Sequence, residues 1–535
     1  MNLSLSILDW IICFVVIVGC LGFGLYMAHI KNAGGNSANF FLGGRSIKWP
    51  VVGASLFATN IGAEHLIGLS GDSYRYGLAA GSVELTTAIT LGFACALLFP
   101  YYMKNKVFTI PEFLEIRYNR RARTLFSCLM LIISIMTKLA FTLFAGALVL
   151  KSILGWDIMI TVFWIGILVA IFTIIGGFTA VAYTESIQVC ILLVGALVML
   201  FFGLDKVGGW DALMANVPDR MSIGRPAEDP YSFWGILFTA FYAGIFYWGI
   251  DQVNVQRALA AKDIRHARWG AMFASALKLL PIFIFALPGV IAFALYPGME
   301  GEASQQTFVW MINNLLPSGL KGLLLASLMA ALVTSLIAVL NSVSTLIVRD
   351  FVLEFRPDVS EKNQVYLGRI CIILVTLLGV AAAYLVHKND EGLYKYLQTI
   401  TSYLVIPIFP AIFFGICSKK VTLKGAAASV IAGVIIATIF VIDQMMTVEA
   451  AGNAFPFLHT KYTTHFGFRG LWAEILITGI LFCVSAFTPK TAPDKLEKTT
   501  ANYSGKIARF EGYKDWRLYL IILSAITILL WIWLY

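Results

Sequence analysis

Two oppositely charged side chains lie inside apolar stretches of this sequence, where charge is costly. Glu84 lies about two turns into the stretch 77–103, and Lys278 about two and a half turns into the stretch 269–295. A charge at the centre of a membrane helix costs roughly 2.5–3.5 kcal/mol on insertion scales. If both face one cavity, they partly neutralise each other and offer hydrogen-bond acceptors and donors to a polyhydroxylated ligand. A purely structural buried ion pair is the alternative.

A second group of polar residues lies in the apolar stretch 48–70. Asn60, Glu64 and His65 fall within the sequence GASLFATNIGAEHLIG, and their spacing puts polar groups on more than one side of a helix. An uninterrupted helix would place some of them in lipid, so the pattern favours a break beside a cavity. Taken alone, His65 could equally be a packing histidine, and Gln398, in the sequence YLQTITSYL, an ordinary polar residue near a helix end.

Oxygen-bearing residues recur on one face of the stretch 319–348. Ala331, Thr334 and Ser335 have the i, i+3, i+4 spacing that places them on the same side of a helix. Hydroxyl and carbonyl oxygens are hard ligands that suit a small hard cation. The alternative is that the two hydroxyls bond to carbonyls of their own helix, which is common for Ser and Thr.

The elements that carry these residues are apolar segments long enough to cross a membrane. The chain has 535 residues, of which 59% are hydrophobic and 13% charged, too few charges to cover a soluble chain of this length. The sequence therefore predicts an all-α membrane protein with fourteen transmembrane helices. They are expected near residues 7–28, 48–70, 77–103, 124–150, 158–177, 184–204, 231–250, 269–295, 319–348, 366–387, 395–417, 423–442, 470–487 and 517–534.

The distribution of Lys and Arg predicts the orientation of these helices. With the N-terminus outside, 27 of the 39 basic residues fall in loops on the inner side and 10 in loops on the outer side. Inner loops of membrane proteins are enriched in Lys and Arg, so both termini are expected outside. The same asymmetry accounts for the net charge of +9 without a nucleic-acid partner.

Two apolar stretches contain small and polar residues at corresponding places. One is 48–70, and the other is 231–250, which runs into the sequence FYAGIFYWGIDQ. Five helices separate their starts, so the two run in opposite directions, as in an inverted repeat of five plus five helices. Interrupted helices in matching positions indicate a binding site near the midplane, although glycine also serves close helix packing. The expected domains are a first helix and loop (1–47), a repeat core (48–442, with halves 48–204 and 231–442) and a C-terminal part (443–535).

Several longer strings resemble the sodium/solute symporter family, and within it the sodium/glucose (sodium/galactose) cotransporters. The resemblance covers about residues 40–430 and implies a LeuT-type fold, in agreement with the five-plus-five repeat preceded by one helix and followed by three. The strings are FFLGGRSIKWPVVGASLFATNIGAEHLIGLSG, TIPEFLEIRYNRR, IIGGFTAVAYTESIQ, YWGIDQVNVQRALAAKD, LKLLPIFIFALPG, LNSVSTLIVRDF and YLQTITSYL.

The resemblance implies a sugar site. Sugar hydroxyls would be held by polar side chains, and an aromatic residue, Tyr247, would stack on the sugar and close its inner side, with Trp248 following it. The matching polar residues are Asn60, His65, Glu84, Lys278 and Gln398. Gly244 stands where relatives carry Asn or Thr. His65 and Lys138 resemble the animal cotransporters more than the bacterial galactose symporter.

The resemblance also implies an ion site and gates. Sodium would be held by the carbonyls of Ala58, Ile61 and Ala331 and by the hydroxyls of Thr334 and Ser335. Glu185 takes the place of an acidic residue near the sodium exit route, usually Asp. Outer-gate positions match Leu69, Val83 and Tyr394. Ile337 and Ala338 lack the oxygens that a second sodium uses in some relatives, so one sodium per sugar is expected.

We therefore expect a sodium-driven symporter for a neutral monosaccharide, and not an enzyme, because no nucleophile–base constellation is present. Glu84 beside Lys278 favours a neutral ligand over an anion. A carrier of another polyol such as myo-inositol, or a sugar sensor that does not transport, is the alternative. The protein is expected as a multi-pass protein of the plasma membrane, such as a bacterial inner membrane. Its partners would be sodium, a monosaccharide and the lipid bilayer, with a monomer sufficient for transport.

Overall fold

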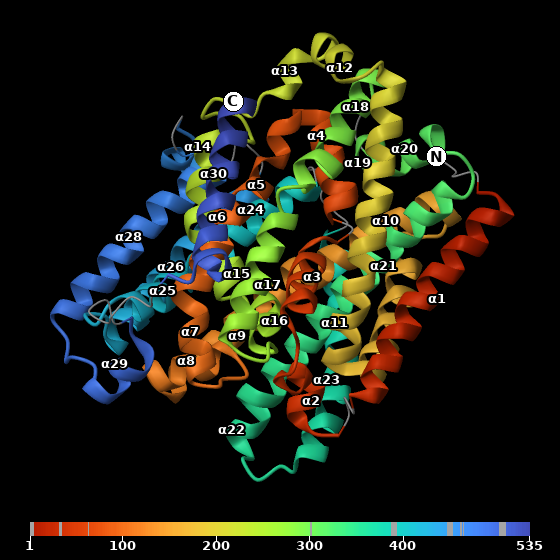
Figure 1. Ribbon diagram of the computed structural model, residues 1–535. Coiled ribbons are helices and arrows are strands. Elements are labelled where there is room, and N and C mark those ends of the chain that lie inside the picture. Colours follow the sequence, from red (N-terminus) through yellow and green to blue (C-terminus); the bar gives the residue numbers. More distant parts are fainter. Residues whose placement is uncertain are drawn as a thin grey trace.

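The protein is helical throughout the part that the structure describes. The computed structural model describes residues 5–31, 35–62, 64–299, 302–386, 393–446, 453–460, 463, 465–501 and 510–535. Within these ranges there is no β-sheet, and a single backbone bridge joins Ile47 to Ala261. Figure 1 shows long helices that run alongside one another, with α1 and α11 on one side and α26 and α28 on the other. The expectation of an all-α membrane protein is confirmed.

Ten of the described helices are long and apolar enough to cross a membrane. Two further candidates are helix pairs bent by more than 40°. The ten are Ile7–Ile30 (α1), Leu78–Lys104 (η3 to α7), Arg120–Lys151 (α9 into α10), Ile158–Val207 (α11), Ile264–Leu295 (α17 to α18), Leu320–Phe355 (α21 to α22), Glu361–Tyr384 (in α23), Leu423–Met445 (α26), Phe466–Ala486 (α28) and Trp516–Leu534 (α30).

The helix α11 is interrupted at a glycine. A straight helix of its 50 residues would be about 75 Å long, more than twice the ~30 Å hydrocarbon core of a bilayer. Gly177 breaks it, with φ 55° and ψ −162°. A Cβ at this position would lie 2.9 Å from the ring of Phe40, so both the conformation and the space require glycine. The break falls where the sequence separates the apolar segments 158–177 and 184–204.

The two helices expected to be interrupted are both interrupted. α3 (Trp49–Asn60) ends where Ile61 turns extended, and the chain resumes as a π-helical turn, Glu64–Leu69 (η2), and then α4 (Ser70–Tyr76). The segment Phe233–Gly249 (α14, η6 and α15) bends by 50° into α16 (Gln252–Leu259). Asp251 caps α16, because its side chain accepts a hydrogen bond from the backbone of Val253.

A third interruption was not predicted. Leu397–Val405, within α24 (Leu393–Val405), meets α25 (Phe409–Cys417) at an angle of 55°. Pro407 lies in the break, and proline has no backbone N–H to continue a helix. The segment 395–417 was expected as one uninterrupted helix.

The interrupted helix α3 lies inside the bundle. It packs against α11, α16, α17 and α21, and Gly53 brings its backbone close to α17, since a Cβ there would lie 2.6 Å from the carbonyl oxygen of Gly270. Small residues allow such close approach between membrane helices. The C-terminal end of α3 is therefore surrounded by the other helices that carry the candidate residues.

Candidate functional site

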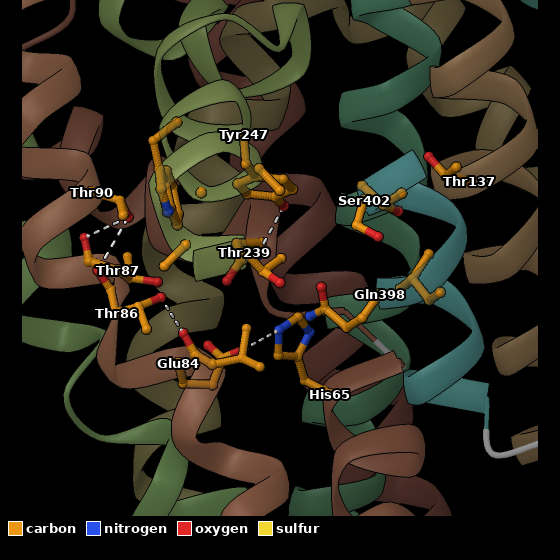
Figure 2. A pocket seen from close by; sticks show the side chains of 18 of the residues that line it. His65, Glu84, Thr86, Thr87, Thr90, Thr137, Thr239, Tyr247, Gln398 and Ser402 are labelled. Atoms are coloured by element: carbon orange, nitrogen blue, oxygen red, sulfur yellow. Dashed lines mark hydrogen bonds and ion pairs between the residues drawn. The ribbon is translucent and has the colours of Figure 1, made fainter. Parts of the chain in front are cut away.

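The seven residues expected to bind sugar line one cavity of about 120 Å³. They come from elements that are far apart in sequence but end or bend at this place (Figure 2). Asn60 ends α3, His65 lies in η2, Glu84 in α5 (Ser82–Leu85), Tyr247 and Trp248 in α15 (Ile245–Gly249), Lys278 follows α17 (Ile264–Leu277), and Gln398 lies in α24. That these residues hold sugar stays a prediction.

An acid–base group forms the charged wall of this cavity. Glu84 bonds the ammonium of Lys278 with one carboxylate oxygen and the Nε2 of His65 with the other, at 3.2 Å. All three side chains are buried, and Figure 2 shows His65 and Glu84 pointing toward one another. Lys278 caps the C-terminal end of α17, where the helix dipole favours a positive charge. The group presents donors and acceptors with little net charge, which suits a neutral ligand with several hydroxyls.

The opposite wall joins two interrupted helices. The Asn60 amide nitrogen donates to the Tyr247 hydroxyl at 2.8 Å, so the end of α3 is tied to α15. The amide oxygen of Asn60 is buried and has no hydrogen-bond partner among the described residues. It is therefore placed to accept a hydrogen bond from a ligand hydroxyl.

Lys138 supports Tyr247 from one side. Its ammonium lies 4.3 Å from the centre of the Tyr247 ring and 2.6 Å from the carboxylate of Asp251. Asp251 lies in the bend between α15 and α16, so Lys138 links the ring to that bend. The sequence predicted only that Lys138 lies inside an apolar segment. In the structure, its ammonium connects the Tyr247 ring to Asp251.

Hydroxyl side chains that the sequence reading missed complete the lining. They come from five helical segments and are Thr59, Thr86, Thr87, Thr90, Thr137, Thr142, Thr239, Thr401 and Ser402; Ser335, expected at the sodium site, also lines the cavity. Thr86 and Thr90 donate to carbonyls of their own helix, so they can only accept from a ligand. One signal was available, since Thr87 and Thr90 follow Glu84 at intervals of three residues and so share its side of a helix.

The five residues expected to hold sodium lie on two helices that pack together, α3 and α21 (Leu320–Ile347). Ala58 is among the last residues of α3, whose carbonyls lack partners within the helix. Ala331, Thr334 and Ser335 are buried on α21, and the hydroxyl of Ser335 has no hydrogen-bond partner in the described part of the chain. Ile61 directly follows the end of α3. The ion site itself stays a prediction.

A glutamine that the sequence reading missed touches this group. The side-chain amide of Gln188, on α11, bonds the hydroxyl of Thr334, which also donates to the carbonyl of Ala330 at 3.0 Å. Gln188 is fully buried and lies three residues after Glu185, on the same side of α11. That spacing was the available signal.

Glu185 is enclosed in a fully paired cluster. Its carboxylate accepts from Ser55, from Thr59 at 3.0 Å and from Arg257 at 3.3 Å, and the side chains of Glu185 and Arg257 have no exposed surface. Arg257 also donates to Thr59 at 2.8 Å and to the carbonyl of Val253. Its place near an ion exit route stays a prediction, and the sequence reading did not single out Arg257.

The gate positions are only partly described. Leu69 is fully buried at the end of η2, and Val83 lines the cavity. The side chain of Tyr394 lies outside the described residues. Ile337 and Ala338 are fully buried on α21 and bring no side-chain oxygen to the group around Thr334. Their gating and ion-selecting roles stay predictions.

Comparison with known families decides the assignment. A family model described as the sodium:solute symporter family matches residues 40–433. This chain belongs to that family. Among curated members of the family, it is 31% identical to sodium/glucose cotransporter 4 of Mus musculus over 540 residues, which cover 93% of this chain and 78% of the relative. It is 33% identical to sodium/myo-inositol cotransporter 2 of Oryctolagus cuniculus over 468 residues, or 81% of this chain and 69% of the relative.

Solved structures agree on the fold. A sodium-coupled sialic acid symporter, in a substrate-bound outward-open state, superposes with a TM-score of 0.75 at 19% identity, over 91% of this chain and 99% of that one. A nucleobase-cation-symport-1 family transporter superposes with a TM-score of 0.55 at 14% identity, over 86% of this chain and 97% of that one. At these identities the likeness concerns the fold alone.

Proposed function

We propose that this chain takes up a neutral monosaccharide of the glucose or galactose class together with sodium, by alternating access. The observation that carries this proposal is the group of Glu84, Lys278 and His65, which lines one cavity together with Asn60 and Gln398 between interrupted helices. Its opposite charges favour a neutral ligand. The relatives named for glucose and for myo-inositol support a sugar or polyol as the solute.

The architecture that we propose for this activity has fourteen transmembrane helices and a LeuT-type inverted repeat. One helix (1–47) precedes the repeat core 48–442, whose halves are 48–204 and 231–442, and the C-terminal part 443–535 completes three following helices. The breaks after Asn60 and after Gly249 lie at corresponding places in the two halves, which supports the repeat. We place both termini outside, in a plasma membrane such as a bacterial inner membrane, with a monomer sufficient.

Cysteine labelling tests this orientation. In a variant without the native cysteines, a cysteine near residue 500, at the exposed position Glu497, should react with a membrane-impermeant maleimide only from the cytoplasmic side. A cysteine at residue 455 should react from outside. The reverse pattern would overturn the orientation while leaving the fold untouched.

In the proposed mechanism, sodium joins α3 to α21 through the carbonyls of Ala58, Ile61 and Ala331 and the hydroxyls of Thr334 and Ser335. This favours an outward-open arrangement and completes the sugar cavity. Closure then buries both ligands, and a membrane potential of about 100 mV favours inward movement of each sodium by about 2.3 kcal/mol. Coupling arises because both ligands stabilise the same occluded state.

Uptake into proteoliposomes tests the proposal directly. Labelled glucose or galactose should accumulate with an inward sodium gradient and should not accumulate without it. Saturable binding with no sodium-driven accumulation would favour the sensor alternative. Stronger competition by myo-inositol than by either sugar would favour a polyol carrier.

The sodium site has its own test. Thr334→Ala with Ser335→Ala should abolish sodium-dependent uptake, because both hydroxyl ligands are lost. Ile337→Val, one turn away, should leave it unchanged and serves as the matched control. The reversal potential of the transport current at known gradients should correspond to one sodium per sugar, and a value for two would show that a further oxygen ligand exists.

A further inference from the structure

A glutamate outside the proposed mechanism is buried without a partner. Glu474 lies about two turns into α28 and is 5% exposed. Neither of its carboxylate oxygens has a hydrogen-bond partner among the described residues. An ionised carboxylate in such a place is far more costly than a neutral acid, because nothing replaces its lost water.

No cation of the surrounding elements pairs with this carboxyl within the described residues. Arg469, on the same helix, bonds Asp443 of α26 at 2.6 Å and the carbonyls of Leu458 and Thr463. The titratable and charged side chains on the elements packed against α28 are Tyr242 of η6, Lys395 and Tyr403 of α24, Cys417 of α25, and Lys424 and Asp443 of α26; α14 carries none. His465, Arg469 and the exposed Cys483 are the others on or beside α28 among the described residues. Of these groups, Tyr242 is the one that interacts with Glu474.

The Tyr242 hydroxyl (in η6, Ala240–Gly244) reaches α28 beside this acid. A Cβ at Gly470 would lie 1.8 Å from that hydroxyl, so the ring occupies the space left by the glycine. Gly470 and Glu474 are four residues apart and therefore lie on the same side of α28. Tyr242 is fully buried and interacts electrostatically with Glu474.

The Tyr242 hydroxyl also lies close to the wall of the proposed sugar cavity. It lies near the hydroxyls of Ser402 and Thr239, both of which line the cavity (Figure 2). Ser402 itself donates to the carbonyl of Thr399 at 2.7 Å. Its oxygen can therefore accept a hydrogen bond from Tyr242, and Tyr242 can accept one from a protonated carboxyl. With Glu474 protonated, the series runs from the carboxyl to Tyr242 and on to Ser402, and every donor in it has an acceptor.

We propose that Glu474 is a proton-binding site, occupied at neutral pH and linked to the sugar cavity through the hydroxyls of Tyr242 and Ser402. Loss of the proton leaves a buried carboxylate, toward which the Tyr242 hydroxyl turns to donate, so this hydroxyl no longer donates to Ser402. Ser402, which lines the cavity, then loses the hydrogen bond from Tyr242. Because coupling between two binding sites is reciprocal, a ligand that orders the cavity wall at Ser402 also raises the proton affinity of Glu474. The link to sugar rests on the proposed function, whereas the proton site does not.

Infrared spectroscopy of the purified protein tests the proton site without reference to transport. At pH 7 the native protein should show a carbonyl stretch of a protonated carboxylic acid that Glu474→Gln lacks. Tyr242→Phe should retain this band at a shifted wavenumber, because the acid loses its hydrogen-bond partner, and this shift assigns the band to residue 474 if the glutamine variant fails to fold. Spectra in which neither comparison assigns a protonated carboxyl to residue 474, or in which residue 474 is ionised at pH 7, would overturn the proposal.

Binding of glucose or galactose as a function of pH tests the link. The affinity of the native protein should fall about fivefold or more as the band disappears at alkaline pH. The affinity of Glu474→Gln, which cannot lose a proton, should stay constant over the same range. Parallel profiles for the two proteins would disprove the link while leaving the proton site. If the native protein bound neither sugar, the proposed function would fail and the infrared result would still decide the site.

Discussion

Two buried acid–base pairs lie on opposite sides of the helix break in α3, and they differ in what surrounds them. Glu84 and Lys278 face the cavity, together with His65. Glu185 and Arg257 are enclosed by protein, and their remaining bonding capacity is taken by Ser55, Thr59 and the carbonyl of Val253. The first pair adjoins space that water or a ligand can enter, and the second does not.

This difference separates a binding role from a structural one. A pair beside a cavity can exchange partners with a ligand, because the ligand's hydroxyls replace water at little cost. An enclosed pair has already exchanged water for protein, so breaking it leaves a charge that nothing can solvate. Arg257 ties α16, α3 and α11 together next to two helix breaks, where the backbone itself supplies fewer hydrogen bonds.

The largest expected effect follows from breaking the enclosed pair. Arg257→Leu should lower the free energy of unfolding by about 3–5 kcal/mol, because Glu185 loses its cation partner inside the protein and keeps only the hydroxyls of Ser55 and Thr59. Thermal unfolding in detergent and the yield of folded protein measure this loss. The double variant Arg257→Leu with Glu185→Leu should recover part of it. A single variant as stable as the native protein would show that the pair is not enclosed as described.

Breaking the cavity pair should affect binding more than stability. Glu84→Ala removes a partner of Lys278 and His65 and should weaken sugar binding by about 1–3 kcal/mol, on the order of 5- to 150-fold. The loss of unfolding free energy should be smaller than for Arg257→Leu, since water in the cavity can solvate Lys278. Calorimetric titration with sugar and thermal unfolding give the two values. A larger loss of stability than of affinity would make this pair structural as well.

The smallest effect is expected at the rim of the same cavity. Gln398→Glu replaces the amide donors with acceptors and should weaken sugar binding toward the lower end of the same range of about 1–3 kcal/mol. Because Gln398 is half-buried, unfolding should be unchanged. The same titration measures it, with Thr438→Val on α26 as the control, because that hydroxyl bonds its own helix and lies outside the cavity. Unchanged affinity in both Gln398→Glu and Glu84→Ala would remove these residues from the site.

Much of this arrangement could be predicted from local patterns. Apolar runs locate most helices to within a few residues, because the bilayer requires a long uninterrupted apolar surface. Polar and small residues in the apolar stretches 48–70 and 231–250 predicted the two helix breaks. The free-energy cost of a charge inside a membrane indicated Glu84 and Lys278 as candidate binding residues. Each of these signals is carried by neighbouring residues and needs no knowledge of the packing.

The features that were missed depend on contacts between distant segments. Arg257 follows a helix break in a polar stretch, and it becomes a buried partner only because α16 packs against α3 and α11. Gln188 becomes a candidate site residue only because its side chain forms a hydrogen bond with Thr334, which lies 146 residues away in the sequence. Pro407 was a local signal for the break between α24 and α25, and the apolar run around it concealed that break.

The double attachment of the Tyr247 ring has a kinetic consequence. The ring is held by the hydrogen bond from Asn60 at its hydroxyl and by Lys138 over its face, and Lys138 is itself paired with Asp251 in the bend below. A small rotation of the ring weakens both contacts at the same time, so moving the ring out of this position has to cross a free-energy barrier. In the proposed uptake, this side chain would set how long the bound solute waits before it is released into the cell. The number of solute molecules moved per cycle would depend on other residues. A protein with Tyr247→Phe would release sooner and lose some of the strictness with which one solute follows the other.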